Sequence, residues 1–412
     1  MGYYSNIREL IGRKQMKRRS FLQISLAAAT AMVAVFAGSV GIASADQGIY
    51  DDKIVLGSHQ PLSGPVALWG VPVTNGMRMA VEEINAKGGI HGRMIELIVE
   101  DSAYQQNKAA QAGDKLLKKD KVFALIGALG TPPNMVTMPR ALKMGVMNIF
   151  PVTAANEMFL PHHKLKFGGF TPYSDQMQAA VKYFVDNNGV KKIGVLYQDD
   201  DFGKNVLHGC EDQAKDMGLD EVVKTNFKRG AKDFSSQIAQ LKSEGVELVC
   251  LGTIIGETIG SMATAKKIGY EPIFVVSSAG YVPENVTLAK GLTEGLYGTG
   301  QSPIPYYEDA TPEVKAWMDK YKERFGDDAV LQSIAGYDLM EVFAMALEKA
   351  GPEPTADNVA EAIESIKDYQ NIFGGAPYSF SAEDHLGPDA RNSASLYQVQ
   401  GDKWKLISAI SY

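Results

Sequence analysis

The chain has 412 residues, more than one hydrophobic core usually holds, so its length predicts two lobes of ordinary domain size. Apolar residues make up 45% of the chain and charged residues 22%, which excludes an intrinsically disordered protein. The net charge of −7 becomes −12 without the first 45 residues, which leaves 35 basic and 47 acidic side chains. That acidity excludes nucleic acid and anionic lipid surfaces as predicted partners.

Residues 1–45 are predicted to be a cleaved signal peptide. A basic cluster, Lys17-Arg18-Arg19, precedes an apolar run from residue 21 to about residue 40. The run ends in the small residues Ala43-Ser44-Ala45, a pattern after which signal peptidase cuts. We therefore expect export and cleavage before Asp46, with a retained membrane anchor as the alternative.

The export route is left open by the sequence. The stretch Arg18-Arg19-Ser20-Phe21-Leu22-Gln23 resembles the twin-arginine signal, but an arginine pair is also common in ordinary secretion signals. Met16 is a second candidate start, with residues 1–15 then preceding the natural protein. Later segments fall short of about 18 uninterrupted apolar residues, so the exported chain is predicted to be soluble.

From Lys53 onward, short apolar runs alternate with amphipathic stretches, which predicts a parallel sheet covered by helices on both faces. Met77, Ala80 and Ile84, for example, share one face at helical spacing. The predicted strands are 53–57, 95–100, 122–126 and 147–150, and the predicted helices are 74–86, 107–118 and 134–143.

The same alternation restarts after Lys166, so the fold class is α/β with two doubly wound, Rossmann-like lobes. Its predicted helices are 175–187, 203–217, 234–244, 257–268 and 283–290, with strands 192–197, 221–226, 246–251 and 273–277. Helices 312–325, 332–349 and 356–366 and a hairpin of strands 394–400 and 403–408 follow. These last pieces are too few for a third lobe, so the chain is expected to cross between the two lobes more than once.

The sequence predicts no enzymatic, metal or cofactor site. The chain lacks the Gly-x-Ser-x-Gly nucleophile motif, the Gly-x-x-x-x-Gly-Lys phosphate loop and the His-Glu-x-x-His zinc motif. The pair His162-His163 is interpreted as a surface loop, and Asp199-Asp200-Asp201 as a helix cap. Cys210 and Cys250 are interpreted as two separate buried thiols, with a disulfide as the alternative.

Two loops that follow predicted strands suit an anion, because ligands of open α/β sheets lie outside the carboxyl ends of the strands. Residues 61–70 (PLSGPVALWG) follow the first predicted strand and lead into a helix, and Leu129-Gly130-Thr131-Pro132-Pro133-Asn134 does the same one unit later. Thr131 and Thr153 supply a hydroxyl. Exposed amides at a helix start, with a hydroxyl beside them, favour a carboxylate because the helix N-terminus is partly positive. Capping of their own helices is the alternative role of Thr131 and Thr153.

Four segments, in this order along the chain, carry a family resemblance. They are Pro61-Leu62-Ser63-Gly64-Pro65, residues 80–92 (AVEEINAKGGIHG), residues 199–204 (DDDFGK) and Lys232-Asp233-Phe234-Ser235. With them, the chain from Ile54 to about Val399 resembles the periplasmic solute-binding proteins of the branched-chain amino acid type, which serve ATP-driven importers.

The resemblance implies the type I periplasmic binding fold, in which two lobes are joined by three hinge crossings. It also implies a periplasmic monomer that is not an enzyme, uses no cofactor and delivers a small carboxylate to a membrane permease, with a sensory receptor as the alternative. The implied first lobe is 46–172 plus 302–375, the second is 173–301 plus 376–412, and the crossings lie near 171–174, 300–303 and 374–377.

Matching positions of the family also imply roles for individual residues. Thr131 and Thr153 match the hydroxyls that hold the ligand carboxylate, while Trp69 and Phe202 match the aromatic residues that cover the ligand from the two lobes. The candidate ligand-binding residues are Trp69, Leu129, Thr131, Val152, Thr153, Ala154, Tyr173, Phe202, Ile254 and Tyr281.

Two positions depart from the family pattern. Its amino acid binders hold the ligand ammonium with acidic residues, and Tyr173 and Tyr281 stand at those positions here. A buried ammonium without an anionic partner is costly. The hypothesis is therefore a carboxylate without an α-ammonium, such as a benzoate or a phenylpropenoate, in a slot that offers nothing anionic. The alternative is an amino acid whose ammonium is held by Asp175, Glu257 or Glu284.

Overall fold

Residues 47–388 and 393–412 are described by the computed structural model of the chain. The predicted signal peptide, its cleavage site and the alternative start at Met16 lie outside these residues. Within the described part, no helix has the length and apolar character needed to cross a bilayer.

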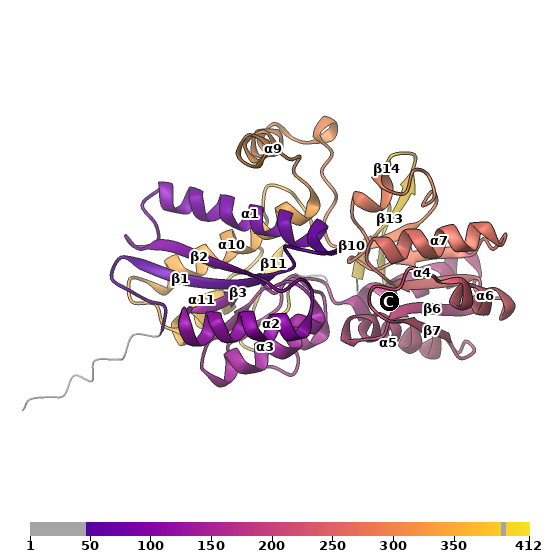
Figure 1. Ribbon diagram of the computed structural model, residues 1–412, viewed down its shortest axis with the longest axis horizontal. Helices are drawn as coiled ribbons and strands as arrows, with labels where there is room; N and C mark the ends of the chain where they lie inside the picture. Colours follow the sequence, from indigo (N-terminus) through magenta and orange to yellow (C-terminus); the bar gives the residue numbers. More distant parts are fainter. Residues whose placement is uncertain (1–46, 389–392) are drawn as a thin grey trace, which may run out of the picture. The chain divides into compact units, whose positions relative to one another are not determined.

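The first lobe is a five-stranded parallel sheet with helices on both faces (Figure 1). Its strand order is β2-β1-β3-β4-β5, with α1 and α10 together on one face and α2 and α3 on the other. The elements are β1 (Lys53–Gln60), α1 (Ala67–Ala86), β2 (Met94–Asp101), α2 (Gln106–Asp114) with a π-helical turn (Lys115–Lys119), β3 (Ala124–Ile126), α3 (Thr131–Lys143), β4 (Met147–Ile149), a 3₁₀ turn (Asn156–Met158), β5 (Lys166–Phe167), α9 (Pro312–Phe325), α10 (Leu331–Ala350) and α11 (Ala356–Glu364).

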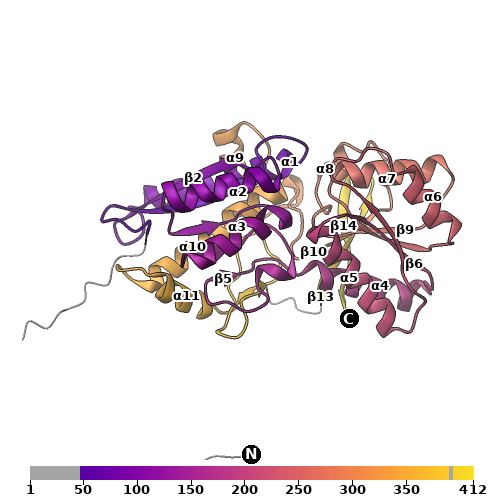
Figure 2. The ribbon, with the colours of Figure 1, turned by 60° about the horizontal axis from the view of Figure 1, so that its bottom comes forward.

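The second lobe is a seven-stranded sheet in the order β14-β13-β10-β9-β8-β6-β7. Five strands are parallel, and the C-terminal hairpin β13–β14 adds an antiparallel edge. Figure 2 shows α4 and α5 on one side of this sheet and α6 and α7 on the other. The elements are α4 (Tyr173–Asn188), β6 (Ile193–Gln198), α5 (Asp201–Asp216), β7 (Val223–Phe227), α6 (Ser235–Ser243), β8 (Leu248–Gly252), α7 (Gly256–Lys267), β9 (Ile273–Val276), α8 (Glu284–Thr287), β10 (Tyr297–Gly300), a 3₁₀ turn (Tyr307–Asp309), β13 (Ser393–Gln400) and β14 (Lys403–Ser411).

Both sheets repeat one winding, which confirms the predicted α/β class. The parallel strands have the orders β2-β1-β3-β4-β5 and β7-β6-β8-β9-β10. In each order, the second strand along the chain lies on one side of the first strand, and the third strand lies on its other side. Ligands bind at such a switch point, outside the carboxyl ends of the strands on either side of it. The topology therefore directs attention to the loops after β1 and β3 in the first lobe and after β6 and β8 in the second.

α1 and α10 pack in direct backbone contact at two glycines. A β-carbon on Gly76 of α1 would lie 1.9 Å from the carbonyl oxygen of Ser333, and one on Gly336 of α10 would lie 2.1 Å from that of Val73. Only glycine permits so close an approach between two helices. The contact fixes the rotation of α10, so the face opposite to Gly336 is held toward the space between the lobes.

A short ribbon near the C-terminus packs on the first lobe. Its strands are β11 (Tyr378–Ser379) and β12 (Gly387–Pro388). Between them the buried ring of Phe380 has its centre 5.5 Å from that of Phe150 and 6.0 Å from that of Phe167. The sequence placed the third crossing near 374–377. Because these contacts tie the ribbon to the first lobe, we propose that residues 378–388 belong to that lobe rather than to the second.

Two helices begin earlier than the sequence predicted, and both contain prolines near their start. α1 starts at Ala67 rather than at residue 74 and contains Pro72, while α3 starts at Thr131 and contains Pro132-Pro133 in its first turn. First-turn N–H groups have no partner within a helix, so Pro132 and Pro133 cost α3 no hydrogen bond, whereas Pro72 lies beyond the first turn of α1 and removes one. Pro132 and Pro133 had been interpreted as part of the loop Leu129–Asn134.

The second lobe contains a disulfide between Cys210 of α5 and Cys250 of β8. The first interpretation, two separate thiols, is therefore wrong, although both residues are buried as expected. Asp200 accepts hydrogen bonds from the backbone N–H groups of Phe202 and Gly203 at the start of α5, which confirms its role as a helix cap.

Candidate functional site

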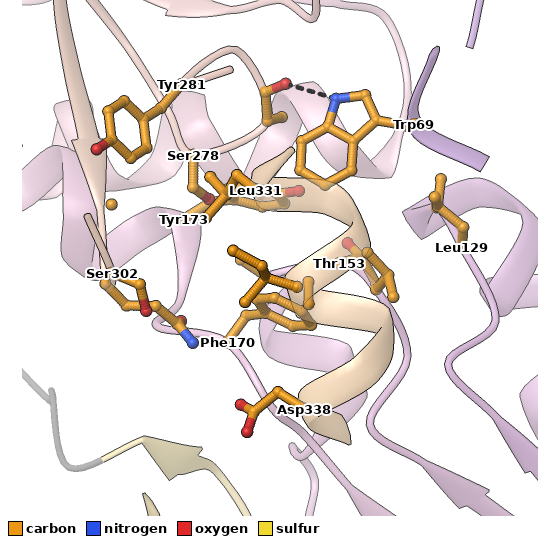
Figure 3. Close-up of a pocket in the computed structure, with 18 of the residues that line it drawn as sticks. Trp69, Leu129, Thr153, Phe170, Tyr173, Ser278, Tyr281, Ser302, Leu331 and Asp338 are labelled. Carbon is orange, nitrogen blue, oxygen red and sulfur yellow. Dashed lines mark hydrogen bonds between the residues drawn. The ribbon is translucent and has the colours of Figure 1, made fainter. Parts of the chain in front are cut away.

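One cavity lies between the two lobes, at the ends of the strands that the topology singles out (Figure 3). It contains about 1010 Å³ of non-atom space, part of which is open solvent. The ten residues selected from the sequence all line it: Trp69, Leu129, Thr131, Val152, Thr153, Ala154, Tyr173, Phe202, Ile254 and Tyr281. Their role in ligand binding stays a prediction.

A pair of hydroxyls forms one polar wall. The Oγ1 atoms of Thr131, at the start of α3, and Thr153, after β4, lie 2.6 Å apart and are buried. The side chain of Tyr173 also interacts with Thr153, while burial raises the pKa of the Tyr173 phenol and keeps it neutral. The first turn of α3 has no side-chain cap, so Thr131 is available for a role other than capping its own helix.

The backbone contributes less to this wall than the sequence suggested. α3 was expected to present several amides to an anion, but Pro132 and Pro133 have no N–H, so within its first three residues only Thr131 carries an amide proton. The helix dipole and the two threonine hydroxyls remain as the favourable groups for a carboxylate.

Aromatic side chains form the remaining walls near the hydroxyl pair. Trp69 donates from Nε1 to the carbonyl oxygen of Ala279 at 3.2 Å, which holds the indole of the first lobe against the second. The rings of Tyr173 and Phe202 meet edge to face with their centres 5.1 Å apart. Phe170, which the sequence analysis did not select, also lines the cavity.

Tyr281 presents its ring to the cavity but uses its hydroxyl elsewhere. The oxygen accepts a hydrogen bond from the backbone N–H of Ile304 at 3.2 Å, and the ring stacks on Tyr397 with a centre-to-centre distance of 4.4 Å. Burial raises the pKa of Tyr281 well above its usual value. The hydroxyl of Tyr281 is therefore bonded within the protein, and only its ring faces the cavity.

Asp338 of α10 is the residue that the sequence analysis missed. It lies on one helical face with Leu331, Ile334 and Ala335, all of which line the cavity. The carboxyl is 4% exposed and interacts with Asn371 and Tyr378, whereas its Oδ1 has no hydrogen-bond partner among the described residues. Burial raises its pKa from 3.8 to about 6, so it is mostly ionised at neutral pH.

This carboxylate overturns the hypothesis that the slot offers nothing anionic. Among the described residues that line the cavity, Asp338 is the only one of the Asp, Glu, Lys, Arg or His type. The sequence shows that Asp338 and Leu331 share one helical face. It does not show that this face meets the cavity, because the rotation of α10 depends on the glycine contacts with α1.

The three acids considered as alternatives do not line the cavity. Ser174 Oγ donates to Asp175 at 3.1 Å, and Gln332 Nε2 of the first lobe donates to Glu284 of the second at 2.9 Å. Burial raises the pKa of Glu257, which lies outside the lining residues.

The sequence pattern of the family described as "Periplasmic binding protein" matches residues 53–403. The chain belongs to this family. One relative is the "Leucine-, isoleucine-, valine-, threonine-, and alanine-binding protein" of Pseudomonas aeruginosa, 28% identical over 316 residues, which cover 76% of this chain and 83% of the relative. Another is "Leu/Ile/Val-binding protein homolog 7" of Brucella melitensis, 26% identical over 92% of this chain and 95% of the relative.

Solved structures of similar proteins share the type I periplasmic binding fold. A branched-chain amino acid ABC transporter protein from Thermus thermophilus with bound valine has a TM-score of 0.77 at 17% identity, covering 87% of this chain and 97% of its own. A fatty acid ABC transporter substrate-binding protein from Thermomonospora curvata also has 0.77, at 24% identity, covering 88% and 93%. At this identity, the likeness establishes the fold of this family member and not its ligand.

Contacts between the lobes surround the cavity of this binding protein. Arg229 of the second lobe donates to the carbonyl oxygen of Tyr104 in the first lobe at 2.5 Å, and its guanidinium lies 4.6 Å from the centre of the Tyr104 ring. Asn205 accepts from the backbone N–H of Asn156 and donates to Glu157, both at 3.0 Å. Together with the Trp69 bond, these contacts hold the two walls together. Among the described residues, no group of three His, Cys, Asp or Glu side chains is placed to hold a metal ion.

Proposed function

We propose that this periplasmic binding protein captures an amino acid for an ABC importer. The proposal rests on one observation, the buried carboxylate of Asp338 in the cavity wall. Among the described residues that line the cavity, none is Lys, Arg or His. An amino acid carries both kinds of group that this cavity suits: an ammonium to neutralise Asp338 and a carboxylate to bond to the hydroxyls of Thr131 and Thr153. A buried charge is stable only when it is paired in this way.

The same charge argues against the aromatic acid that the sequence analysis favoured. A benzoate or phenylpropenoate brings a second negative charge into the cavity and offers Asp338 no cation. Like charges in a site of low dielectric repel each other strongly. The aromatic walls formed by Trp69, Tyr173 and Phe202 suit the apolar part of an amino acid equally well, because flat rings bury aliphatic chains without a specific partner.

The names of the relatives support an amino acid as the ligand. The Pseudomonas aeruginosa protein is named for five amino acids, and the Thermus thermophilus structure contains valine. The fatty acid protein shows that the fold alone does not fix the ligand. All are named as binding or transporter proteins, which supports a non-enzymatic role, a permease partner and a periplasmic location for this chain.

Capture follows from closure of the lobes. Residues from both lobes line the cavity, so a ligand that touches both stabilises the closed form by its differential affinity for the two states. The closed form is then the state that the permease receives. The bond from Trp69 to Ala279 holds the indole at the seam between the lobes, which supports its proposed role as a cover for the ligand.

A thermal-shift screen tests the proposed function. The protein, freed of bound ligand by unfolding and refolding, is heated with the common L-amino acids, benzoate, 4-hydroxyphenylpropenoate and hexadecanoate. At least one amino acid is expected to raise the melting temperature with a saturable concentration dependence. Stabilisation by an aromatic or fatty acid, with no response to any amino acid, would overturn the proposal.

A further inference from the structure

The cavity is elongated along α10. Leu331 and Asp338 lie seven residues apart on the lining face, and a helix rises 1.5 Å per residue, so they are separated by roughly 10 Å along the helix axis. Figure 3 shows Asp338 at the end of the cavity remote from Trp69, with Phe170 between Asp338 and the region of Trp69 and Thr153. The hydroxyl pair and the carboxylate therefore serve different ends of one ligand.

The end that contains Asp338 is a built polar site. The helix holds the carboxyl in place, Asn371 and Tyr378 interact with it, and Oδ1 is left without a partner among the described residues. Gln301 fixes the neighbouring backbone at Thr171, because its Oε1 accepts from the N–H of Thr171 at 2.7 Å, and its Nε2 donates to Tyr378 Oη at 3.4 Å. These contacts leave one carboxylate oxygen for a ligand.

We propose that Asp338 receives an ammonium group at the end of the ligand remote from its carboxylate, so the substrate class is an amino acid with a terminal side-chain amine or an ω-amino acid. This inference rests on the proposed function, and it assigns Asp338 the role of a specificity-determining residue in the same cavity.

The α-ammonium of an amino acid does not fill this role. It is attached to the carbon that bears the carboxylate, so a carboxylate held by Thr131 and Thr153 keeps the α-ammonium at that end of the cavity. An aliphatic side chain would then reach toward Asp338 and leave the buried charge unpaired. A terminal amine removes this penalty and gains a charge-assisted hydrogen bond.

Two pairs of ligands that differ only in the terminal amine test the inference by calorimetry. Lysine is compared with norleucine, and δ-aminovalerate with valerate. We expect the amine to tighten binding by about tenfold or more, as for other hydrogen bonds to buried charged groups. In Asp338→Asn this advantage is expected to disappear. In Glu341→Gln, which removes a partly buried acid one turn further along α10 and outside the cavity, it should be retained.

The possible results separate this inference from the proposed function. If norleucine or leucine binds as tightly as lysine, the amino acid proposal stands and the assignment of Asp338 is wrong. If none of the amino acids binds, the proposed function itself is wrong. The comparison within the wild-type protein needs no variant, and an amine preference that persists in folded Asp338→Asn would also contradict the assignment.

Discussion

At the scale of single residues, the carboxylate of Asp338 reduces the stability of the ligand-free protein. Its pKa is raised by burial from 3.8 to about 6, with Glu341 as the other acid that acts on it and Tyr369 and Tyr378 as the phenols that face it. Between pH 3.8 and about pH 6 this carboxyl binds more protons in the folded state than in the unfolded state, so the free energy of unfolding falls as the pH rises. The full difference corresponds to about 3 kcal/mol.

Asp338→Asn is therefore expected to stabilise the ligand-free protein at pH 7.5 by about 1–3 kcal/mol, because the amide keeps the shape without the buried charge. At pH 4 the carboxyl of the folded wild-type protein is protonated, and the two proteins should be nearly equal in stability. Urea denaturation at both pH values measures the difference. A variant that is less stable than wild type by the same amount at both pH values would contradict this account.

At the scale of secondary-structure elements, the contact between α1 and α10 determines which side chains reach the cavity. Gly76→Ala would place a methyl group 1.9 Å from the carbonyl oxygen of Ser333 and force the two helices apart. We expect a loss of about 1–3 kcal/mol in the free energy of unfolding, as for other overpacked sites. Gly256→Ala at the start of α7 is the matched control, since its β-carbon would meet no atom within 4 Å.

The control is expected to be neutral or slightly stabilising, because alanine is the better helix former by about 1 kcal/mol. Gly76→Ala should also weaken ligand binding, since α10 carries Asp338. Chemical denaturation and calorimetry of both variants measure the two effects. Equal stabilities for Gly76→Ala and Gly256→Ala would show that the helices can separate without cost.

The sequence was sufficient for the elements that repeat locally. Alternating strands and amphipathic helices predicted most of both sheets, although β5 and β10 were not predicted. The loops after β1, β3, β6 and β8 follow from the general topology of such sheets. What it missed depends on contacts between distant segments. The ribbon at Phe380 joins the first lobe through Phe150 and Phe167, and Asp338 faces the cavity because α1 fixes the rotation of α10. Local periodicity contains neither relation.

At the scale of the whole binding protein, affinity depends on closure as well as on contacts with the ligand. The apparent dissociation constant rises as the fraction of closed protein falls, and it does so equally for every ligand. Arg229 is suited to set this fraction, because it contacts Tyr104 across the seam and also donates to Asp200 in its own lobe at 2.8 Å. It does not line the cavity.

Arg229→Ala is therefore expected to weaken the binding of lysine and norleucine by the same factor, about 3- to 10-fold, as removal of a cation–π contact and a hydrogen bond suggests. Small-angle scattering of the ligand-free variant should show a more open average form. Arg324→Ala is the matched control, since its bonds to Glu82 at 2.7 and 2.9 Å lie within the first lobe. A change in the ratio of the two affinities would mean that Arg229 acts on the ligand and not on closure.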